Sequence, residues 1–233
     1  MKEMDSDKYT KAIEDYLKTI FKLQFEEKPV STTSIAKELN ISGASVTGML
    51  KRLAELPSKR DKTKLLVDYN SYKGVTLTDE GEFEALAILR RHRLIELFLK
   101  ESVGFSLSKV HAESCNMEHC VSDEFIDKID ELLGRPKFSP LGNPIPTKAG
   151  FVPEITSLPL TQVDLNKNYV VSRISDDNVE MVAYFEEMRF LPGLELKLIS
   201  RAPFNGPIVI EYENKESIIG HEIGKNIFVD SIK

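Results

Sequence analysis

Apolar residues in the first part of the chain recur every three or four positions, which is the spacing of one helix face. The pattern predicts an amphipathic helix over Tyr9–Gln24 and two shorter helices over residues 33–40 and 44–56. Hydroxyl side chains at 31–33 can cap the first short helix, and Ile-Ser-Gly at 41–43 forms a tight connector to the second. Two short helices joined by a Gly-containing turn predict a helix-turn-helix.

Alternation of apolar and polar residues replaces the helical period after Pro57. The runs at 65–69 and 73–78 flank a turn at Ser71–Gly74, which predicts a β-hairpin in the place of the wing of a winged helix-turn-helix. A long helix is predicted next, from Thr78 to about Val103. Because this helix is apolar nearly all round, it must be buried on several sides, and a helix–helix dimer interface would bury it.

Proline and β-forming residues shape the rest of the chain. A helix is predicted over Ser122–Gly134, and six prolines between Arg135 and Pro159 then predict an extended linker. Five short apolar runs follow, with a helix at 179–188 between the first two, which predicts a small β-barrel. The runs are residues 168–174, 194–200, 206–213, 216–223 and 226–230.

The composition is that of a globular protein, with 41% hydrophobic and 29% charged residues. No apolar run approaches the ~18–20 residues of a membrane span, and the charged N-terminus lacks the apolar core of a signal peptide. The two cysteines, Cys115 and Cys120, would point apart on one helix. We therefore expect reduced thiols and a cytoplasmic protein with no membrane partner.

Charge is unevenly distributed along the chain. The net charge of −6 argues against a nucleic-acid partner, but residues 51–64 hold six basic and two acidic side chains. The N-terminal residues of a recognition helix meet base edges. The candidates here are Ser42, Ala44, Ser45 and Thr47. The DNA phosphates would be contacted by Lys51, Arg52 and the basic cluster at 59–64. The alternative for the cluster is a solvated loop without a DNA contact.

Three of the four histidines lie between residues 92 and 119, each close to a second potential metal ligand. His92 and Glu96 are four apart, and a longer group would form one stripe along a single helix. The longer group is His111, Cys115, Glu118 and His119. A lone His/Glu pair is more often a solvated polar face, but imidazole, thiolate and carboxylate together favour a first-row divalent metal.

Five segments resemble the diphtheria-toxin-repressor family of metal-dependent transcriptional regulators. They are EDYLKTIFKL (14–23), RRHRLIELFL (90–99), VHAESCNMEHCVSDE (110–124), SPLGNPIP (139–146) and FLPGLELKLISRAP (190–203). The last segment is similar to the FeoA-type SH3-like barrel that ends the longer members. The resemblance covers nearly the whole chain and implies a homodimer that binds a double-stranded DNA operator.

The resemblance also implies two metal sites. The primary site would join Asp15 to Cys115, Glu118 and His119. The ancillary site would join His92, Glu96 and His111 to an acid of the barrel. Asp15 is typical of manganese-responsive members and Cys115 of iron-responsive ones, so Fe²⁺ is slightly favoured over Mn²⁺, with Zn²⁺ or Co²⁺ binding in vitro. Lys18 stands where binuclear manganese members have a second carboxylate, and Gly48 replaces a longer polar residue.

Pattern and resemblance together predict a mainly α N-terminal part, with a winged helix-turn-helix and a helical dimerisation domain, followed by a small all-β SH3-like barrel. The predicted boundaries are 1–80 for DNA binding, 81–143 for metal binding and dimerisation, 144–159 for the proline-rich linker and 160–233 for the barrel.

The predicted function is a metal-activated repressor of metal-uptake genes, which is not an enzyme and has no small-molecule substrate. A metal held by Asp15 and by ligands beyond the dimer helix would favour the geometry that reaches two operator half-sites. Two alternatives stay open. One is a helical metalloenzyme that uses the His/Glu/Cys cluster, which would need an open coordination position and a general base. The other is a DNA-binding protein whose metal site is vestigial.

Overall fold

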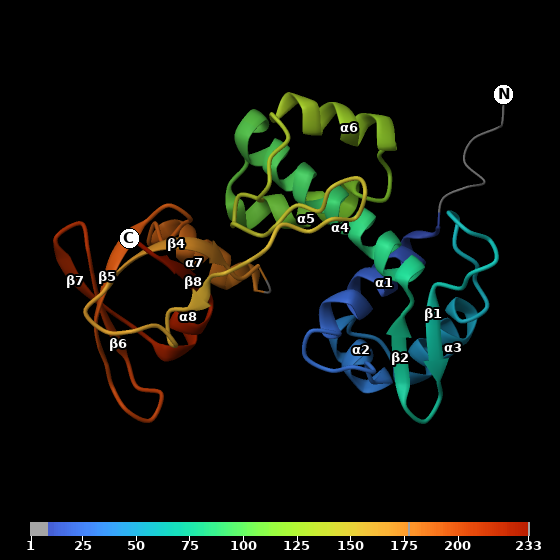
Figure 1. Cartoon of the computed structure of the whole chain (residues 1–233), viewed down its shortest axis with the longest axis horizontal. Coiled ribbons are helices and arrows are strands. Elements are labelled where there is room, and N and C mark those ends of the chain that lie inside the picture. Colours follow the sequence, from blue (N-terminus) through green and yellow to red (C-terminus); the bar gives the residue numbers. More distant parts are fainter. Residues whose placement is uncertain (1–8, 177, 233) are drawn as a thin grey trace. The chain divides into compact units, whose positions relative to one another are not determined.

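The structure, a computed structural model, describes residues 9–176 and 178–232 (Figure 1). The chain divides into two compact units, of which the first has one buried core and the second has two. The first unit runs to Arg91 and includes 118–120 and 146–151, and the second holds 92–117, 121–145 and the chain from 152 onward.

Three helices begin the first unit: α1 (Lys11–Leu23), α2 (Thr32–Glu38) and α3 (Gly43–Leu53). The side-chain oxygens of Ser31 and Ser42 accept hydrogen bonds from the backbone N–H three residues on, so each caps the helix that follows it. The apolar faces of the three helices form one core, which confirms the predicted helix-turn-helix.

The wing is a hairpin of β1 (Val67–Asn70) and β2 (Gly74–Leu77), antiparallel with Val67 opposite Leu77. Its turn is held by Asn70, whose Oδ1 accepts hydrogen bonds from the N–H groups of Tyr72 and Lys73. Gly74 has φ +113°, and a Cβ there would lie 2.3 Å from the carbonyl oxygen of Val30. Only glycine allows that close approach, so the turn requires a glycine at this position. The predicted hairpin is confirmed.

Helix α4 (Asp79–Phe98) continues into a π-helical turn, η1 (Leu99–Val103), which ends at the left-handed Gly104. Thr78 Oγ1 caps α4 by accepting from the N–H of Gly81. The second unit continues with α5 (Leu107–Met117) and α6 (Asp123–Leu132). These helices agree with the predicted ones, with one correction: Glu118 and His119 lie in the turn after α5, so they do not continue its stripe.

The C-terminal part of the second unit is a six-stranded antiparallel sheet in the order β3-β8-β4-β5-β6-β7 (Figure 1). Its strands are β3 (Leu158–Pro159), β4 (Asn168–Ile174), β5 (Glu195–Arg201), β6 (Ile208–Tyr212), β7 (Lys215–Ile219) and β8 (Ile227–Ser231). Helices α7 (Val179–Glu187) and α8 (His221–Lys225) accompany the sheet. The predicted fold class is confirmed, although β3 was missed and the predicted strand 216–223 wrongly included the start of α8.

The proline-rich segment is folded against the protein over part of its length. Residues 141–146 are all buried, and the N–H of Ser139 donates to the carbonyl of Asn143. Arg93 donates to the carbonyl of Pro144, and Arg90 to that of Pro146. The boundaries predicted for the domains stay a prediction.

Candidate metal centre

Asp15, Glu118 and His119 form one group of potential metal ligands, which we call the first ligand set. Asp15 is on α1, and the other two residues lie in the turn after α5, all within the first unit. One ligand atom from each residue lies within 4.8 Å of the other two. Glu118 is fully buried and the side chain of His119 is 5% exposed, whereas the side chain of Asp15 is 33% exposed, so the set meets water on the side of Asp15.

The orientation of the His119 ring is set by Glu14. His119 Nδ1 lies 2.6 Å from Glu14 Oε2, and the other oxygen of Glu14 accepts from Arg91 at 3.0 Å. Because the Glu14 carboxylate can only accept, Nδ1 is the donor and Nε2 faces the other members of the set. Nε2 lies 3.1 Å from Asp15 Oδ1 and 3.2 Å from Glu118 Oε1, but neither contact has hydrogen-bond geometry. A buried imidazole nitrogen aimed at two carboxylates fits a metal ligand.

The acids around His119 determine its charge when no metal is present. Burial alone lowers the pKa of the ring, but the carboxylates of Asp15, Glu118 and Glu14 outweigh burial and raise the pKa to about 11. Without a metal, a proton on His119 therefore supplies positive charge among these acids.

Lys18, one turn after Asp15 on α1, also supplies positive charge to the first ligand set. Its ammonium lies 2.5 Å from Glu118 Oε1, the oxygen nearest to His119 Nε2. The sequence marked Lys18 as a departure from the family pattern but did not show this contact. Sequence reasoning also missed Glu14 and Arg91, which form an ion pair. Each is a charged residue on an otherwise apolar helix face, and that could have marked them as a buried pair.

His92, His111 and Cys115 form a second group with ligand atoms within 4.8 Å of one another, which we call the second ligand set. It lies within the second unit, on α4 and α5. The two rings are 4.9 Å apart in an edge-to-face arrangement, and Cys115 Sγ is 3.6 Å from His111 Nε2. Helical spacing brings His111 and Cys115 together, and the packing of α5 against α4 adds His92.

Glu96 joins the two rings of the second ligand set. Its Oε1 lies 3.0 Å from His92 Nε2 and 3.3 Å from His111 Nδ1, while its Oε2 is buried without a hydrogen bond. Burial alone raises the pKa of Glu96, but the two histidines lower it to about 2. Contacts with Cys115 and Glu96 raise the pKa of His111 to about 9. The buried carboxylate oxygen that lacks a partner fits a fourth metal ligand.

The structure thus brings all seven predicted ligands into two clusters. Cys115 lies with His92 and His111, and its predicted place beside Asp15 stays a prediction. An acid of the barrel was expected at the ancillary site. That expectation stays a prediction. Glu186 of α7 caps α5, because its carboxylate accepts from the N–H groups of Leu107 and Ser108.

The two sets differ in donor chemistry. Two carboxylates and one imidazole suit Mn²⁺ or Fe²⁺, whereas two imidazoles, a thiol and a carboxylate suit softer ions such as Fe²⁺, Co²⁺ or Zn²⁺. Both sets therefore fit a divalent first-row metal, and the first set is the one better suited to manganese.

Helix α3 presents the residues predicted to read DNA. Ser42, Ala44 and Ser45 are exposed, Thr47 is half-buried, and Lys51 and Arg52 are exposed at the C-terminal end. The Ser42 hydroxyl also caps the helix, and Thr47 Oγ1 donates to the carbonyl of Gly43. Gly48 is exposed, and a Cβ there would have no neighbour within 4 Å. The surface of α3 around Gly48 is therefore open to a partner.

The basic connector between α3 and the wing is tied down by intramolecular contacts. Arg60 forms two hydrogen bonds with Glu80, both at 2.9 Å, and Lys64 lies 3.4 Å from the same carboxylate. The Lys59 ammonium lies over the Tyr9 ring, 3.9 Å from its centroid. These contacts partly neutralise the cluster predicted to bind phosphates, so Lys51 and Arg52 are the better candidates.

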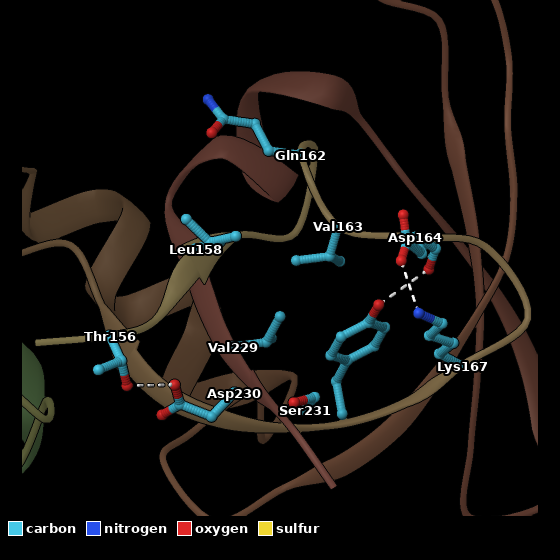
Figure 2. Close-up of a pocket in the computed structure, with 10 residues that line it drawn as sticks. Thr156, Leu158, Gln162, Val163, Asp164, Lys167, Val229, Asp230 and Ser231 are labelled. Carbon is cyan, nitrogen blue, oxygen red and sulfur yellow. Dashed lines mark hydrogen bonds and ion pairs between the residues drawn. The ribbon is translucent and has the colours of Figure 1, made fainter.

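A hollow of about 480 Å³ lies on the barrel, and all its charged side chains are already engaged in contacts with other residues that line it (Figure 2). Lys167 contacts Asp164 at 2.6 Å, and Thr156 contacts Asp230 at 3.1 Å. The hydroxyl of Tyr169 donates to the backbone carbonyl of Asp164. Among the described residues, the groups that could hold a metal ion are therefore the two ligand sets and not the side chains of this hollow.

Comparison with known families and proteins divides the chain into three matched parts. Residues 8–75 match the iron dependent repressor N-terminal DNA binding domain, and residues 78–147 match the iron dependent repressor metal binding and dimerisation domain. Residues 158–231 match the FeoA domain. Among the described residues, no helix is long and apolar enough to span a membrane.

Individual relatives agree with these matches. A helix-turn-helix-type transcriptional regulator of Methanocaldococcus jannaschii is 37% identical over 121 residues, which cover 52% of this chain and 90% of the relative. An iron-dependent repressor of Mycobacterium leprae is 26% identical over 231 residues, 94% of this chain and 96% of the relative. A solved manganese-dependent transcriptional repressor in complex with manganese superposes with a TM-score of 0.83 at 33% identity, covering 94% of this chain and all of that one.

Proposed function

This chain belongs to the iron-dependent repressor family, and from that premise we propose that it is a homodimeric repressor whose binding to DNA is activated by Fe²⁺ or Mn²⁺. The family is one of DNA-binding transcriptional repressors, so the predicted resemblance is confirmed and the metalloenzyme alternative falls away. We further propose that the protein acts in the cytoplasm on genes for metal uptake.

The observation that supports metal activation best is the first ligand set. Asp15 belongs to α1, which packs in the same core as the helix-turn-helix, while Glu118 and His119 lie about a hundred residues later in the chain. When bound, a divalent cation would neutralise these carboxylates and hold α1 to the turn after α5. Residues of α1 would then be less free to move relative to that turn, and the binding surface of α3 would be better ordered.

The residues of the second ligand set, with Glu96, would hold a further cation between α4 and α5. Zn²⁺ and Co²⁺ would bind these softer donors in vitro. We assign the physiological response to the first ligand set, because that set adjoins the DNA-binding helices within one compact unit.

On DNA, the exposed N-terminal residues of α3 would meet base edges in the major groove, and Lys51 and Arg52 would meet phosphates. A homodimer would place two such helices on half-sites about one helical turn apart, ~34 Å. The match of residues 78–147 to a dimerisation domain supports that assembly.

The test starts from DNA rather than from a known operator. A random double-stranded library is selected with the Mn²⁺-loaded protein, and the recovered duplex is then titrated by fluorescence anisotropy in Mn²⁺ and in EDTA. We expect Mn²⁺ to tighten binding by at least about 10-fold, within the usual range of coupling between two sites. The double variant Asp15→Ala/Glu118→Ala should lose that gain, while His221→Gln, outside both ligand sets, should keep it.

Binding that is equally tight in EDTA and in the double variant would overturn the proposal in favour of a DNA-binding protein with a vestigial metal site. The same titration with Fe²⁺ under anaerobic conditions compares the two candidate ions directly.

A further inference from the structure

Lys18 pairs with Glu118, the fully buried acid of the first ligand set. Its Nζ lies 2.5 Å from Glu118 Oε1, and Glu118 has no exposed surface. A buried carboxylate must be paired, because an isolated buried charge is costly. Lys18 meets that need without any metal.

The contact involves the oxygen that a metal would use. Glu118 Oε1 is also the oxygen 3.2 Å from His119 Nε2, on the side where the three ligand atoms converge. An ammonium group and a divalent cation both seek the lone pairs of a carboxylate, and two like charges within a few ångströms repel. Full occupancy of this oxygen by one cation therefore disfavours the other.

We propose that Lys18 is a built-in competitor of the metal, an internal cation that holds Glu118 in the metal-free protein and must withdraw when a divalent ion binds. This inference rests on the proposed function. The side chain of Lys18 is 24% exposed, so its ammonium can turn from Glu118 into water. Arg91 cannot play the same part, because it contacts Glu14, which is not a member of the set.

Competition of this kind raises the free metal concentration at which the site is half occupied. Each metal that enters must first break an ion pair, so the site fills only at a higher free metal concentration than its ligands alone would require. The regulatory consequence is that Lys18 tunes the metal level at which the protein responds, without itself contacting the metal.

The test compares Mn²⁺ affinities by calorimetry in proteins that all carry His111→Ala, which disables the second ligand set. We expect Lys18→Met to bind Mn²⁺ at least about 10-fold more tightly than the Lys18 protein, whereas Lys18→Arg, which keeps a cation, should stay within about threefold. Lys22→Met is the matched control one turn along α1, because Lys22 pairs with Glu38 at the surface. It should leave the affinity unchanged.

Thermal unfolding separates competition from a merely structural role. Lys18→Met should melt lower than the Lys18 protein without metal, because Glu118 loses its partner, and should melt at the same temperature or higher in saturating Mn²⁺. A loss of the same size in both states would overturn the proposal, and so would a folded Lys18→Met protein whose Mn²⁺ affinity is unchanged or weaker.

Amine reactivity tests the inference in the unmodified chain, should the variant fail to fold. Mass spectrometry after brief acetylation should show Lys18 becoming more reactive when Mn²⁺ is added, with Lys22 unchanged. A Lys18 whose reactivity ignores bound Mn²⁺ would overturn the proposal while leaving the proposed function intact. Absence of Mn²⁺ binding to the unmodified protein would overturn the proposed function and this inference together.

Discussion

Hydrogen bonding around His119 shows how single residues prepare a metal site. Arg91 holds Glu14, Glu14 accepts from Nδ1 of the ring at 2.6 Å, and Nε2 is left facing Asp15 and Glu118. Carboxylates behind a ligating histidine fix its orientation and make it a better ligand. In the metal-free protein the same acids keep a proton on the ring, so proton and metal compete for one nitrogen.

Metal affinity should therefore depend on pH. The pKa of His119, about 11 when folded, lies above the ordinary 6.5, so the charged ring stabilises the metal-free fold below pH 6.5, and this contribution is lost as pH rises through about 11. Between these values metal binding must release the proton. In the His111→Ala protein, Mn²⁺ affinity should rise by up to about 10-fold from pH 6.5 to 7.5. His119→Gln should bind more weakly with a flatter profile; equal affinities at the two pH values would contradict this prediction.

Gly48 lowers the stability of α3 without any packing reason that the structure shows. It lies inside α3, where a Cβ would meet nothing within 4 Å. Gly48→Ala should raise the free energy of unfolding by about 0.5–1 kcal/mol, since glycine weakens a helix interior. Urea unfolding measures this change. Gly81→Ala in α4 is the opposite case, because its Cβ would lie 1.9 Å from the carbonyl of Leu66, and it should destabilise. A destabilised Gly48→Ala would show that α3 is not as open as described.

Helix α5 is the element that carries or precedes four of the predicted ligands, and each of its ends is specialised. At its start, Glu186 of the barrel domain accepts from two backbone N–H groups and lies 3.2 Å from Lys100. At its end the helix stops at Met117, so Glu118 and His119 project from a turn. The element therefore holds two members of the second ligand set along its length and precedes two members of the first.

Loss of the cap should loosen the second ligand set. Glu186→Gln removes the negative charge at the positive end of α5, which typically costs about 1 kcal/mol, or about fivefold in an equilibrium constant. Co²⁺ affinity of the second set, followed by the absorbance of the Cys115 thiolate complex, should fall by about that factor. Glu187→Gln, on the exposed neighbouring residue, is the control. Equal losses in both variants would assign the effect to general charge rather than to the cap.

At the scale of the whole molecule, each compact unit contains one ligand set, and no hydrophobic core of the described residues is shared between the units. The members of the first set come from α1 and from residues 118–119, which are distant in sequence and meet only in the folded chain. All members of the second set lie on α4 and α5. A metal on the first set would therefore constrain the unit that contains the DNA-binding helices. The barrel core is built from other residues.

Hydrogen exchange should reveal that division. In the His111→Ala protein, Mn²⁺ should slow amide exchange over α1 and around residues 114–120, because a ligand stabilises the folded state that binds it. Exchange in β5 and β6 should change little, since these strands pack in a different core. Protection spread evenly over both regions would contradict a site confined to the first unit.

Local pattern alone determined a large part of this protein. The period of apolar residues located α1, α3, α4 and most barrel strands, and Ser31 and Thr78 marked helix starts, because periodicity and capping are properties of adjacent residues. Helical spacing also singled out six of the predicted ligands, and the family resemblance added Asp15 and the division into two sites. Short elements were harder: β3 has two residues and gains its stability only by pairing with β8, and α8 begins where a strand was expected to continue.

Only the tertiary structure decided which side chains lie next to the predicted ligands. Sequence spacing placed Cys115 and His119 on one helical stripe, but α5 ends between them, and packing brings His92 to one and Asp15 to the other. The partners that tune the first set, Glu14, Lys18 and Arg91, come from α1 and α4, far from Glu118 in sequence. Distances between such residues depend on how helices pack, and no local pattern contains that information.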